Sequence, residues 1–312
     1  MRIAVLGAGG VGAYYGGLLA RAGHDVVFLA RGTNLDALRS GALEVRTPEE
    51  TFVVRVAATG DAGGIGRADL AIVAVKTYSL VEIAPTVVRA AETGAVVLPL
   101  LNGVEAVGRL AAAGVPGGAI LGGLTQISAV RTAPAVVERR SPFQKVVVGE
   151  TAGGGSERAE RIAEAFRTAG ADAEVSTEIT ADLWRKLAFI ASMAAACGLA
   201  RSPVGLVLAF PLGRLLVERA VRETFAVARG LGIALGDDEE SKTLAFIHSL
   251  PGGLRPSFLV DLEAGGPTEI EDLCGAVSRF GRRVGVQTPV HDTATAALSI
   301  DVRAGLRRDV RG

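Results

Sequence analysis

The first twelve residues constrain the fold more than any other part of the chain. Arg2–Leu6 is a short apolar run typical of a buried strand, and the G-x-G-x-x-G pattern of residues 7–12 follows it directly. A helix is predicted over about 12–22. Glycines here permit a tight turn and let backbone N–H groups at a helix N-terminus approach a pyrophosphate. A ligand-free turn is the alternative, but this context favours a dinucleotide contacted by Gly7, Gly9, Gly10, Val11 and Gly12.

The same segment resembles a membrane span because Ile3–Ala20 contains no charged residue. Six of these eighteen residues are glycine, a poor helix former, so a strand, turn and helix explain the run better. Lys+Arg and Asp+Glu balance at 33 each, which leaves no bulk basic field for nucleic acid. Two cysteines are too few for a disulfide framework. We expect a cytoplasmic protein that binds neither nucleic acid nor membranes.

Apolar strand candidates alternate with helical stretches up to about residue 177, and the rest of the chain has a helical pattern. Alternation of this kind indicates a doubly wound, Rossmann-type sheet, so we expect an α/β fold with an all-α second domain. The predicted domains are 1–177, which binds NADP, and 178–312, a helical domain for substrate binding and dimerisation. The strands are expected at 2–6, 24–31, 52–57, 70–75, 95–101, 119–121, 145–150 and 173–176. The later helices are expected at 157–170, 180–200, 213–231, 237–249, 256–264, 268–284 and 289–305, with Ser156, Thr180 and Thr288 as caps.

The end of the second predicted strand bears on the choice of cofactor. An NAD-binding domain usually places an acidic residue there, to bind the ribose 2′-hydroxyl. This chain has Arg31 instead, whose guanidinium suits a 2′-phosphate. A solvated arginine is the alternative. The sequence therefore favours NADPH over NADH.

Two rare residue types follow neighbouring apolar strands. Lys76 is one of four lysines and follows LAIVAV, and Asn102 is one of two asparagines and follows AVVLPLL. The carboxyl ends of strands border the ligand crevice of a doubly wound sheet, so both residues are candidates to contact cofactor and substrate. A lysine reaching for solvent and an asparagine in a turn are the alternatives.

Three residues of the helical half are candidates for chemistry. Lys186 begins a long apolar helix, where desolvation would lower its pKa and prepare it to donate a proton to a carbonyl. Glu269, in a predicted first helical turn, could keep this ammonium protonated, or could only complement the helix dipole. Ser257, at another predicted helix start, could hold a carboxylate.

Together these motifs resemble the ketopantoate reductase (2-dehydropantoate 2-reductase) family over nearly the whole chain. The resemblance is carried by the glycine loop, VKTYS, LLNGVE, LWRKLAFI and the segment from Ser257 to TEIEDLCG. It implies an NADPH-binding Rossmann domain, a helical domain of the 6-phosphogluconate dehydrogenase C-terminal type, and an active site between them. It also implies that Lys186 is the general acid, that Glu269 anchors the site, that Asn102 and Lys76 border cofactor and substrate, and that Ser257 holds substrate.

The chain departs from the family pattern at four positions. Ile190, Ala194 and Val204 stand where the family usually has asparagines, and Cys274 replaces a fourth. Ile190 and Ala194 share a helix face with Lys186, and an apolar face cannot hydrogen-bond a hydroxylated substrate. The reaction class is therefore better supported than ketopantoate as the substrate.

Other polar residues have simpler interpretations. Cys197 and Cys274 are expected to be packed thiols, and the three histidines are too scattered for a zinc site, so no metal is expected. Arg279, Arg282 and Arg283 are expected to form a solvated basic face.

We therefore expect an NADPH-dependent reductase of a 2-oxo acid, most readily ketopantoate, acting as a homodimer. Two alternatives stay open. One is a hydroxy-acid or opine-type dehydrogenase with a different substrate. The other is a regulator that binds NADPH without turning it over.

Overall fold

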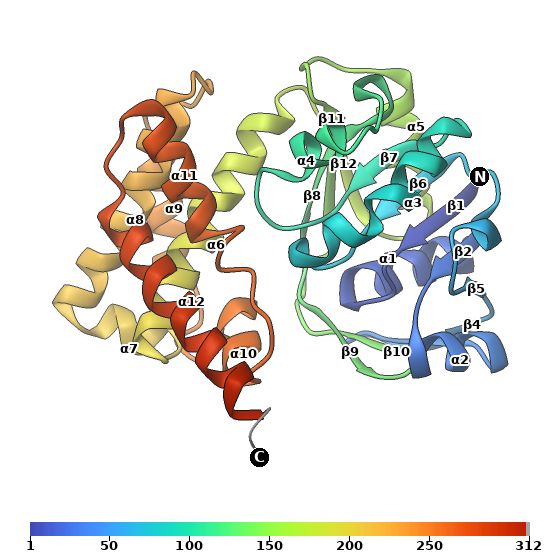
Figure 1. Cartoon of the computed structure of the whole chain (residues 1–312), viewed down its shortest axis with the longest axis horizontal. Coiled ribbons are helices and arrows are strands. Elements are labelled where there is room, and N and C mark those ends of the chain that lie inside the picture. The colour runs from blue at the N-terminus through green and yellow to red at the C-terminus, as the bar shows by residue number, and fades with distance from the viewer. Residues whose placement is uncertain (310–312) are drawn as a thin grey trace. The chain divides into compact units, whose positions relative to one another are not determined.

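The computed structural model describes residues 1–309, with side chains for residues 1–300 (Figure 1). The chain forms two compact units. Unit 1 contains Met1–Leu101 and Ala106–Ile179, and unit 2 contains Asn102–Glu105 and the chain from Thr180 onward. Unit 1 is built on a parallel sheet and unit 2 is helical, so the predicted fold class is confirmed.

The centre of unit 1 is a parallel sheet of five strands in the order β5-β2-β1-β6-β7. The strands are β1 (Arg2–Leu6), β2 (Asp25–Leu29), β5 (Ala57–Thr59), β6 (Leu70–Val73) and β7 (Val96–Pro99). Ile3 and Val5 of β1 enter one buried cluster, while Ala4 and Leu6 enter a second one on the other face. Burial on both faces explains the continuously apolar strands. The strand order reverses at β1 and β6, and the carboxyl ends of these strands are where a doubly wound sheet binds its ligand.

Helices complete the two buried clusters of unit 1. One cluster contains side chains of α1 (Gly10–Arg21), α2 (Gly32–Ser40) and α5 (Glu157–Thr168). The other contains side chains of α3 (Leu80–Glu92) and α4 (Ala106–Ala112). Short 3-10 turns are η1 (Gly63–Ile65), η2 (Thr77–Ser79) and η3 (Gly117–Ala119). The predicted cap of α5 is confirmed, because the Ala159 N–H donates to the Ser156 hydroxyl at 3.2 Å.

Unit 1 also contains two smaller sheets. One has the order β4-β3-β10-β9 and is formed by β3 (Leu43–Arg46), β4 (Thr51–Val54), β9 (Ala129–Ala133) and β10 (Val136–Arg139). The other has the order β12-β11-β8 and is formed by β8 (Leu121–Gln126), β11 (Lys145–Glu150) and β12 (Asp172–Ser176). The predicted strands at 145–150 and 173–176 are confirmed in this second sheet, whereas the strand predicted at 119–121 is misplaced, because Gly117–Ala119 forms η3 and β8 begins only at Leu121. The single strand predicted over 52–57 is wrong. It divides into β4, which pairs with β3, and β5, which pairs with β2. The sequence of a continuous β-rich run does not indicate where the chain stops pairing with one strand and begins to pair with another.

Unit 2 contains seven helices within the described residues. They are α6 (Ile179–Ala200), α7 (Val204–Ala209), α8 (Pro211–Gly230), α9 (Glu239–Ser249), α10 (Ser257–Glu263), α11 (Cys274–Val284) and α12 (Pro289–Asp309). The short helix α7 was not predicted. Thr180 is not a cap, because α6 already begins at Ile179. The helix predicted from 268 begins only at Cys274, and the residues before it form turns.

Helix α6 is the core helix of unit 2. By length and composition it could cross a membrane, with a mean hydropathy of 1.3, and 61% of its most apolar window is buried inside the protein. Leu187 and Ala191 are among its residues in one buried cluster, and Ala188 and Met193 are in a second. Its apolar residues therefore pack against the other helices of unit 2.

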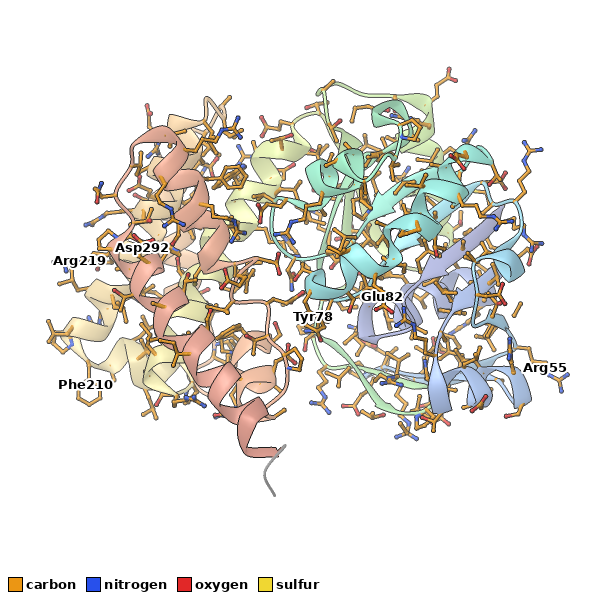
Figure 2. The ribbon with its side chains drawn as sticks, viewed as in Figure 1. Arg55, Tyr78, Glu82, Phe210, Arg219 and Asp292 are labelled. Carbon is orange, nitrogen blue, oxygen red and sulfur yellow. The ribbon has the colours of Figure 1, made fainter. Side chains whose placement is uncertain are left out.

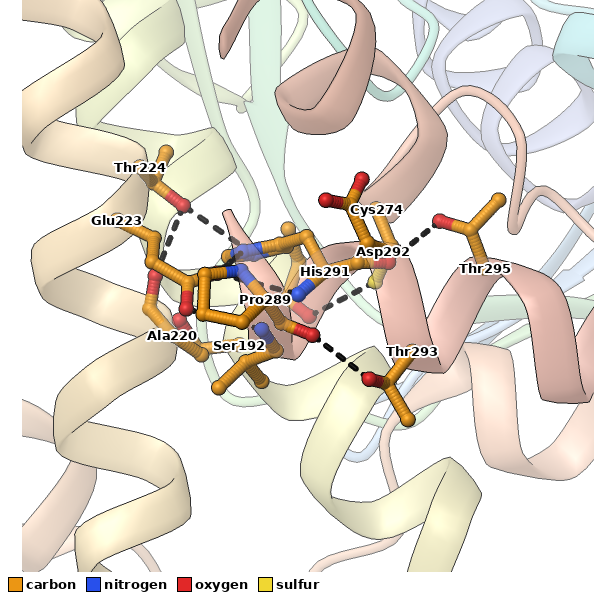
Figure 3. A network of polar contacts seen from close by, with 12 residues as sticks. Ser192, Ala220, Glu223, Thr224, Cys274, Pro289, His291, Asp292, Thr293 and Thr295 are labelled. Carbon is orange, nitrogen blue, oxygen red and sulfur yellow. Dashed lines mark hydrogen bonds and ion pairs between the residues drawn. The ribbon is translucent and has the colours of Figure 1, made fainter. Parts of the chain in front are cut away.

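A buried polar network joins α8 to the start of α12 (Figure 3). The Glu223 carboxylate accepts the backbone N–H groups of Val290 at 2.9 Å and His291 at 3.1 Å, and it lies 2.7 Å from Nδ1 of His291. The other ring nitrogen of His291 lies 3.3 Å from the Thr224 hydroxyl. His291 is fully buried and Glu223 nearly so. A carboxylate thus satisfies the unpaired N–H groups at the N-terminus of α12, where negative charge is favoured.

Candidate active site

The glycine loop lies at the carboxyl end of β1, where the parallel sheet places its ligand site. Gly7 has a φ of +111°, and a Cβ there would lie 2.8 Å from Val75 Cγ1, so the loop requires glycine. A Cβ at Gly12 would lie 2.0 Å from the Gly7 carbonyl oxygen, which brings the helix close to the turn. At Gly9, the residue before α1, a Cβ would meet nothing within 4 Å. The loop therefore leaves the N-terminus of α1 open to an anion.

Asn34, which has no predicted role, supports this loop. It is buried in α2, its Nδ2 donates to the Ala8 carbonyl at 3.2 Å, and its Oδ1 accepts the Ala135 N–H at 2.9 Å. Gly10 packs against β9, because a Cβ there would lie 2.0 Å from the Ala129 carbonyl oxygen. The glycine loop thus rests on the β9–β10 hairpin. Asn34 is one of only two asparagines, and this rarity was the available signal.

Arg31 lies at the N-terminus of α2, after β2, and its side chain is 63% exposed. Its Nη1 is 2.5 Å from Oε1 of Glu82 on α3, which is 60% exposed and labelled in Figure 2. An exposed ion pair of this kind contributes little to stability. The Arg31 guanidinium can therefore exchange Glu82 for another anion at small cost.

Lys76 lies just past β6, as the first residue outside η2, and it is exposed. The preceding residues Ala74 and Val75 pack against Gly7 of the glycine loop. Lys76 is therefore held near the loop by the sheet, and its role toward cofactor or substrate stays a prediction.

Lys186, Glu269 and Asn102 form a group in unit 2 that we call the lysine group. Burial lowers the pKa of Lys186 to about 8, and the nearby Glu269 carboxylate acts in the opposite direction. Nδ2 of Asn102 donates to Oε2 of Glu269 at 3.0 Å. Glu269 is 5% exposed, whereas Lys186 is half-buried and part of it still reaches solvent. The arrangement provides an ammonium that can release a proton near neutral pH beside a fixed carboxylate.

Glu269 lies in a turn before α11. The prediction that it lies in the first turn of a helix is wrong. The Glu269 carbonyl accepts the N–H groups of Asp272 and Leu273, each at 3.0 Å, and α11 begins after them. Ile270 and Leu273 of this turn are buried in the same cluster as Leu187 of α6. Since Glu269 is not in a helical first turn, complementing the dipole of α11 does not explain it.

Ser257 is the first residue of α10 and is exposed. The next residue, Phe258, packs against Gly198, three turns along α6 from Lys186. The role of Ser257 in holding substrate stays a prediction.

The apolar replacements noted in the sequence lie in different surroundings. Ala194 and Val204 are buried in two separate clusters, and Ile190 alone is half-buried, one turn after Lys186. Cys274 is buried and donates its Sγ–H to the Ala191 carbonyl at 3.4 Å. Burial raises the pKa of both cysteine thiols, that of Cys197 to about 12. Ile190 is therefore the replacement that changes the polarity of accessible surface near Lys186.

Within the described residues, no group of three or more His, Cys, Asp or Glu side chains could hold a metal ion. A glycine loop on a Rossmann-type sheet and a depressed-pKa lysine beside a carboxylate define a class of protein, the dinucleotide-dependent oxidoreductases.

Comparison with known proteins gives a more specific result. Residues 3–153 match the family model "Ketopantoate reductase PanE/ApbA", and residues 178–300 match the model of its C-terminal domain. A 2-dehydropantoate 2-reductase of Halobacterium salinarum is 31% identical, covering 98% of this chain and all of that protein. An uncharacterized oxidoreductase of Bacillus subtilis, YkpB, is also 31% identical, covering 96% of this chain and 98% of that protein.

Solved structures agree with this match. A 2-dehydropantoate 2-reductase of Geobacter metallireducens is 29% identical, with a TM-score of 0.89 over 96% of this chain and 99% of that one. A D-mandelate dehydrogenase solved with NADH shares the fold, with a TM-score of 0.87, 21% identity, and coverage of 98% of this chain and 99% of that one. The chain belongs to the ketopantoate reductase family, and it is an oxidoreductase.

Proposed function

We propose that the protein reduces a 2-oxo acid with NADPH, and that 2-dehydropantoate is the first substrate to test. The observation that carries the proposal is the lysine group. Desolvation lowers the pKa of Lys186 to about 8, and Glu269, held by Asn102, keeps the ammonium charged below that pH. General acids work best when their pKa lies near the working pH.

In this reaction the carbonyl carbon gains a hydride and the carbonyl oxygen gains a proton. A reduced nicotinamide, when bound, supplies the hydride. Lys186 supplies the proton from Nζ, leaving a neutral amine that regains a proton from solvent. Glu269 stabilises the charged amine before the transfer and orients it, and Asn102 fixes the Glu269 carboxylate.

The residues of the glycine loop fit a dinucleotide. The open backbone at Gly9 and the free N–H groups at the start of α1 suit a pyrophosphate, and Lys76 lies on the same edge of the sheet. Arg31 supports a 2′-phosphate, since it stands just after the end of β2, where an NAD-binding domain has an acidic residue, and since the ion pair of Arg31 with Glu82 is exposed. These points favour NADPH over NADH.

The second candidate function is reduction of a different 2-oxo acid or oxidation of a related hydroxy acid. Ile190 favours it, because this half-buried apolar side chain near Lys186 offers no hydrogen bond to a hydroxylated substrate. The D-mandelate dehydrogenase that shares this fold acts on a hydroxy acid with an apolar side chain.

A panel of 2-oxo acids tests these alternatives directly. Oxidation of NADPH and NADH is followed by absorbance with 2-dehydropantoate, unhydroxylated aliphatic 2-oxo acids and an aromatic 2-oxo acid. We expect turnover with NADPH and a higher kcat/KM for 2-dehydropantoate than for the others. Preference for an unhydroxylated acid would favour the second function. Binding of NADPH without oxidation by any carbonyl substrate would indicate a regulator.

We predict that kcat/KM for reduction falls as pH rises above about 8. Lys186 must carry its proton to act as an acid, and its pKa is lowered from 10.5 to about 8 by burial. Each further pH unit should therefore cost about a factor of ten. Glu269→Gln removes the carboxylate that raises the Lys186 pKa, so its profile should bend at a lower pH. Profiles of kcat/KM between pH 6 and 10 are measured for the parent protein and for Glu269→Gln. A Glu269→Gln profile that bends at higher pH than the parent profile would contradict the role of Glu269 in keeping Lys186 charged.

We also propose that the protein is a cytoplasmic homodimer. Leu206, Phe210 and Leu212, at the junction of α7 and α8, are large apolar side chains exposed on unit 2, and Phe210 extends from the ribbon in Figure 2. Exposed large apolar side chains so close together in the sequence favour self-association. Light scattering should give a molar mass twice that of one chain. In Leu212→Asp this molar mass should be lower.

A further inference from the structure

Arg279 on α11 connects two segments that lie far apart in the sequence. Its Nη2 donates to Oε2 of Glu105 at 2.5 Å and to the Glu271 carbonyl at 2.8 Å, and its Nη1 lies 3.4 Å from Oε2 of Glu271. The prediction of a solvated face is confirmed only in part for Arg279, because its side chain is 38% exposed but pairs with these groups. It holds for Arg282 and Arg283, which are exposed.

The segment Asn102–Glu105 contacts the Glu269 turn at three points along its length. At its start, the Asn102 amide donates to the Glu269 carboxylate. In its middle, the Gly103 backbone has a φ of +87° and packs so closely that a Cβ would lie 2.8 Å from the Asp272 carbonyl oxygen. At its end, Glu105 is held by Arg279.

The guanidinium of Arg279 is suited to this connection. Its planar set of donors reaches a carboxylate on one segment and a backbone carbonyl on the other at the same time. The Arg279 side chain is 38% exposed and that of Glu105 21% exposed, so solvent screens their ion pair only in part. A lysine could pair with Glu105 but would not present the same fork.

We infer that Arg279 is a positioning residue, which clamps Asn102–Glu105 onto the Glu269 turn and so holds the Asn102 amide against the Glu269 carboxylate. This inference rests on the proposed function, in which Glu269 orients Lys186. Without Arg279, the Glu105 end of the segment Asn102–Glu105 is no longer held against the turn. The Asn102 amide then restrains the Glu269 carboxylate less firmly. Lys186 then loses part of the interaction that keeps it charged.

Arg279→Ala tests the clamp, with Arg282→Ala as the matched control on the same helix. In the protein without cofactor, hydrogen exchange is measured at the amides of Asp272 and Leu273, which donate to the Glu269 carbonyl. Arg279→Ala should speed exchange there by about tenfold or more, as loss of charge-assisted hydrogen bonds implies. Exchange elsewhere in unit 2 should stay unchanged. Equal exchange in the two variants, or faster exchange throughout unit 2, would overturn the clamp.

Kinetics on the active enzyme provide a second measurement. Arg279→Ala should lower kcat/KM for the 2-oxo acid by about tenfold to about a hundredfold, because misplaced catalytic groups cost that much. Its pH profile should bend at lower pH than that of the parent protein, and Arg279→Lys should recover part of the loss. An unshifted profile would contradict positioning.

Glu105→Gln completes a double-mutant cycle. If Arg279 acts through Glu105, the kcat/KM of the double variant should be only slightly lower than that of Arg279→Ala alone. Fully additive losses would contradict the clamp. If the parent protein reduces no 2-oxo acid, the proposed function fails, while exchange at Asp272 and Leu273 still tests the clamp, because Glu105→Gln should speed it as Arg279→Ala does if Arg279 holds the two segments together.

Discussion

Replacing Lys186 with alanine is expected to lower kcat for 2-oxo acid reduction by about 10²-fold to about 10⁴-fold, the range that a general acid contributes. The affinity for NADPH should stay unchanged, because the glycine loop belongs to unit 1 and Lys186 to unit 2. Single-turnover kinetics give the first quantity, and titration of NADPH fluorescence gives the second. Comparable losses of turnover and of NADPH affinity would contradict the role of Lys186 as the acid.

Two further variants separate charge from proton transfer. Lys186→Arg keeps the positive charge, but a guanidinium does not release its proton, so it should be nearly as inactive as Lys186→Ala. Lys242→Ala is the control, since Lys242 is an exposed lysine paired with Asp238 on the surface. It should behave like the parent protein. An active Lys186→Arg variant would show that position 186 supplies charge only.

Replacing Glu223 with glutamine is expected to lower the free energy of unfolding of unit 2 by about 3 kcal/mol. The carboxylate accepts two backbone N–H groups at the start of α12 and lies against Nδ1 of His291. Glutamine has one acceptor oxygen, and its NH₂ group would face another donor, so buried donors are left unsatisfied at about 1 to 3 kcal/mol each.

The only tryptophan makes this loss measurable in unit 2 alone. Trp184 is buried in the core of that unit, so its fluorescence during urea denaturation reports the unfolding of the helices. Glu218→Gln is the matched control on the same helix, because Glu218 pairs with Arg222 at the surface at 3.6 Å. Equal urea midpoints for the two variants would show that the Glu223 network contributes nothing to stability.

Much of the fold follows from local patterns in the sequence. Four strands of the parallel sheet, β1, β2, β6 and β7, are continuous apolar runs because both faces are buried, and their positions are predicted to within a few residues, whereas the position of the edge strand β5 is not. The start of α5 was predicted because the Ser156 cap is a local hydrogen bond. The strand β9 was missed because most of its residues are exposed and show no alternation.

In the candidate site, too, the features with local causes are predicted from the sequence and the contacts between distant segments are not. The glycine loop was predicted because its turn, its open backbone at Gly9 and its helix start are adjacent in the chain. Lys186 and Glu269 were singled out from their residue types and their family resemblance. The contacts of Asn34 and Arg279 were not predicted, because each joins segments about a hundred residues or more apart.

By itself, the sequence determined the elements whose causes lie within a few neighbouring residues, namely the apolar strands, the glycine turn and most of the helices. Only the tertiary structure decided that Asn102 contacts Glu269, that Arg279 holds Glu105, and that Ala194 is buried while Ile190 is not. The physical reason is range. Backbone geometry and side-chain periodicity act over a few residues, whereas burial and ion pairing depend on which distant segments pack together.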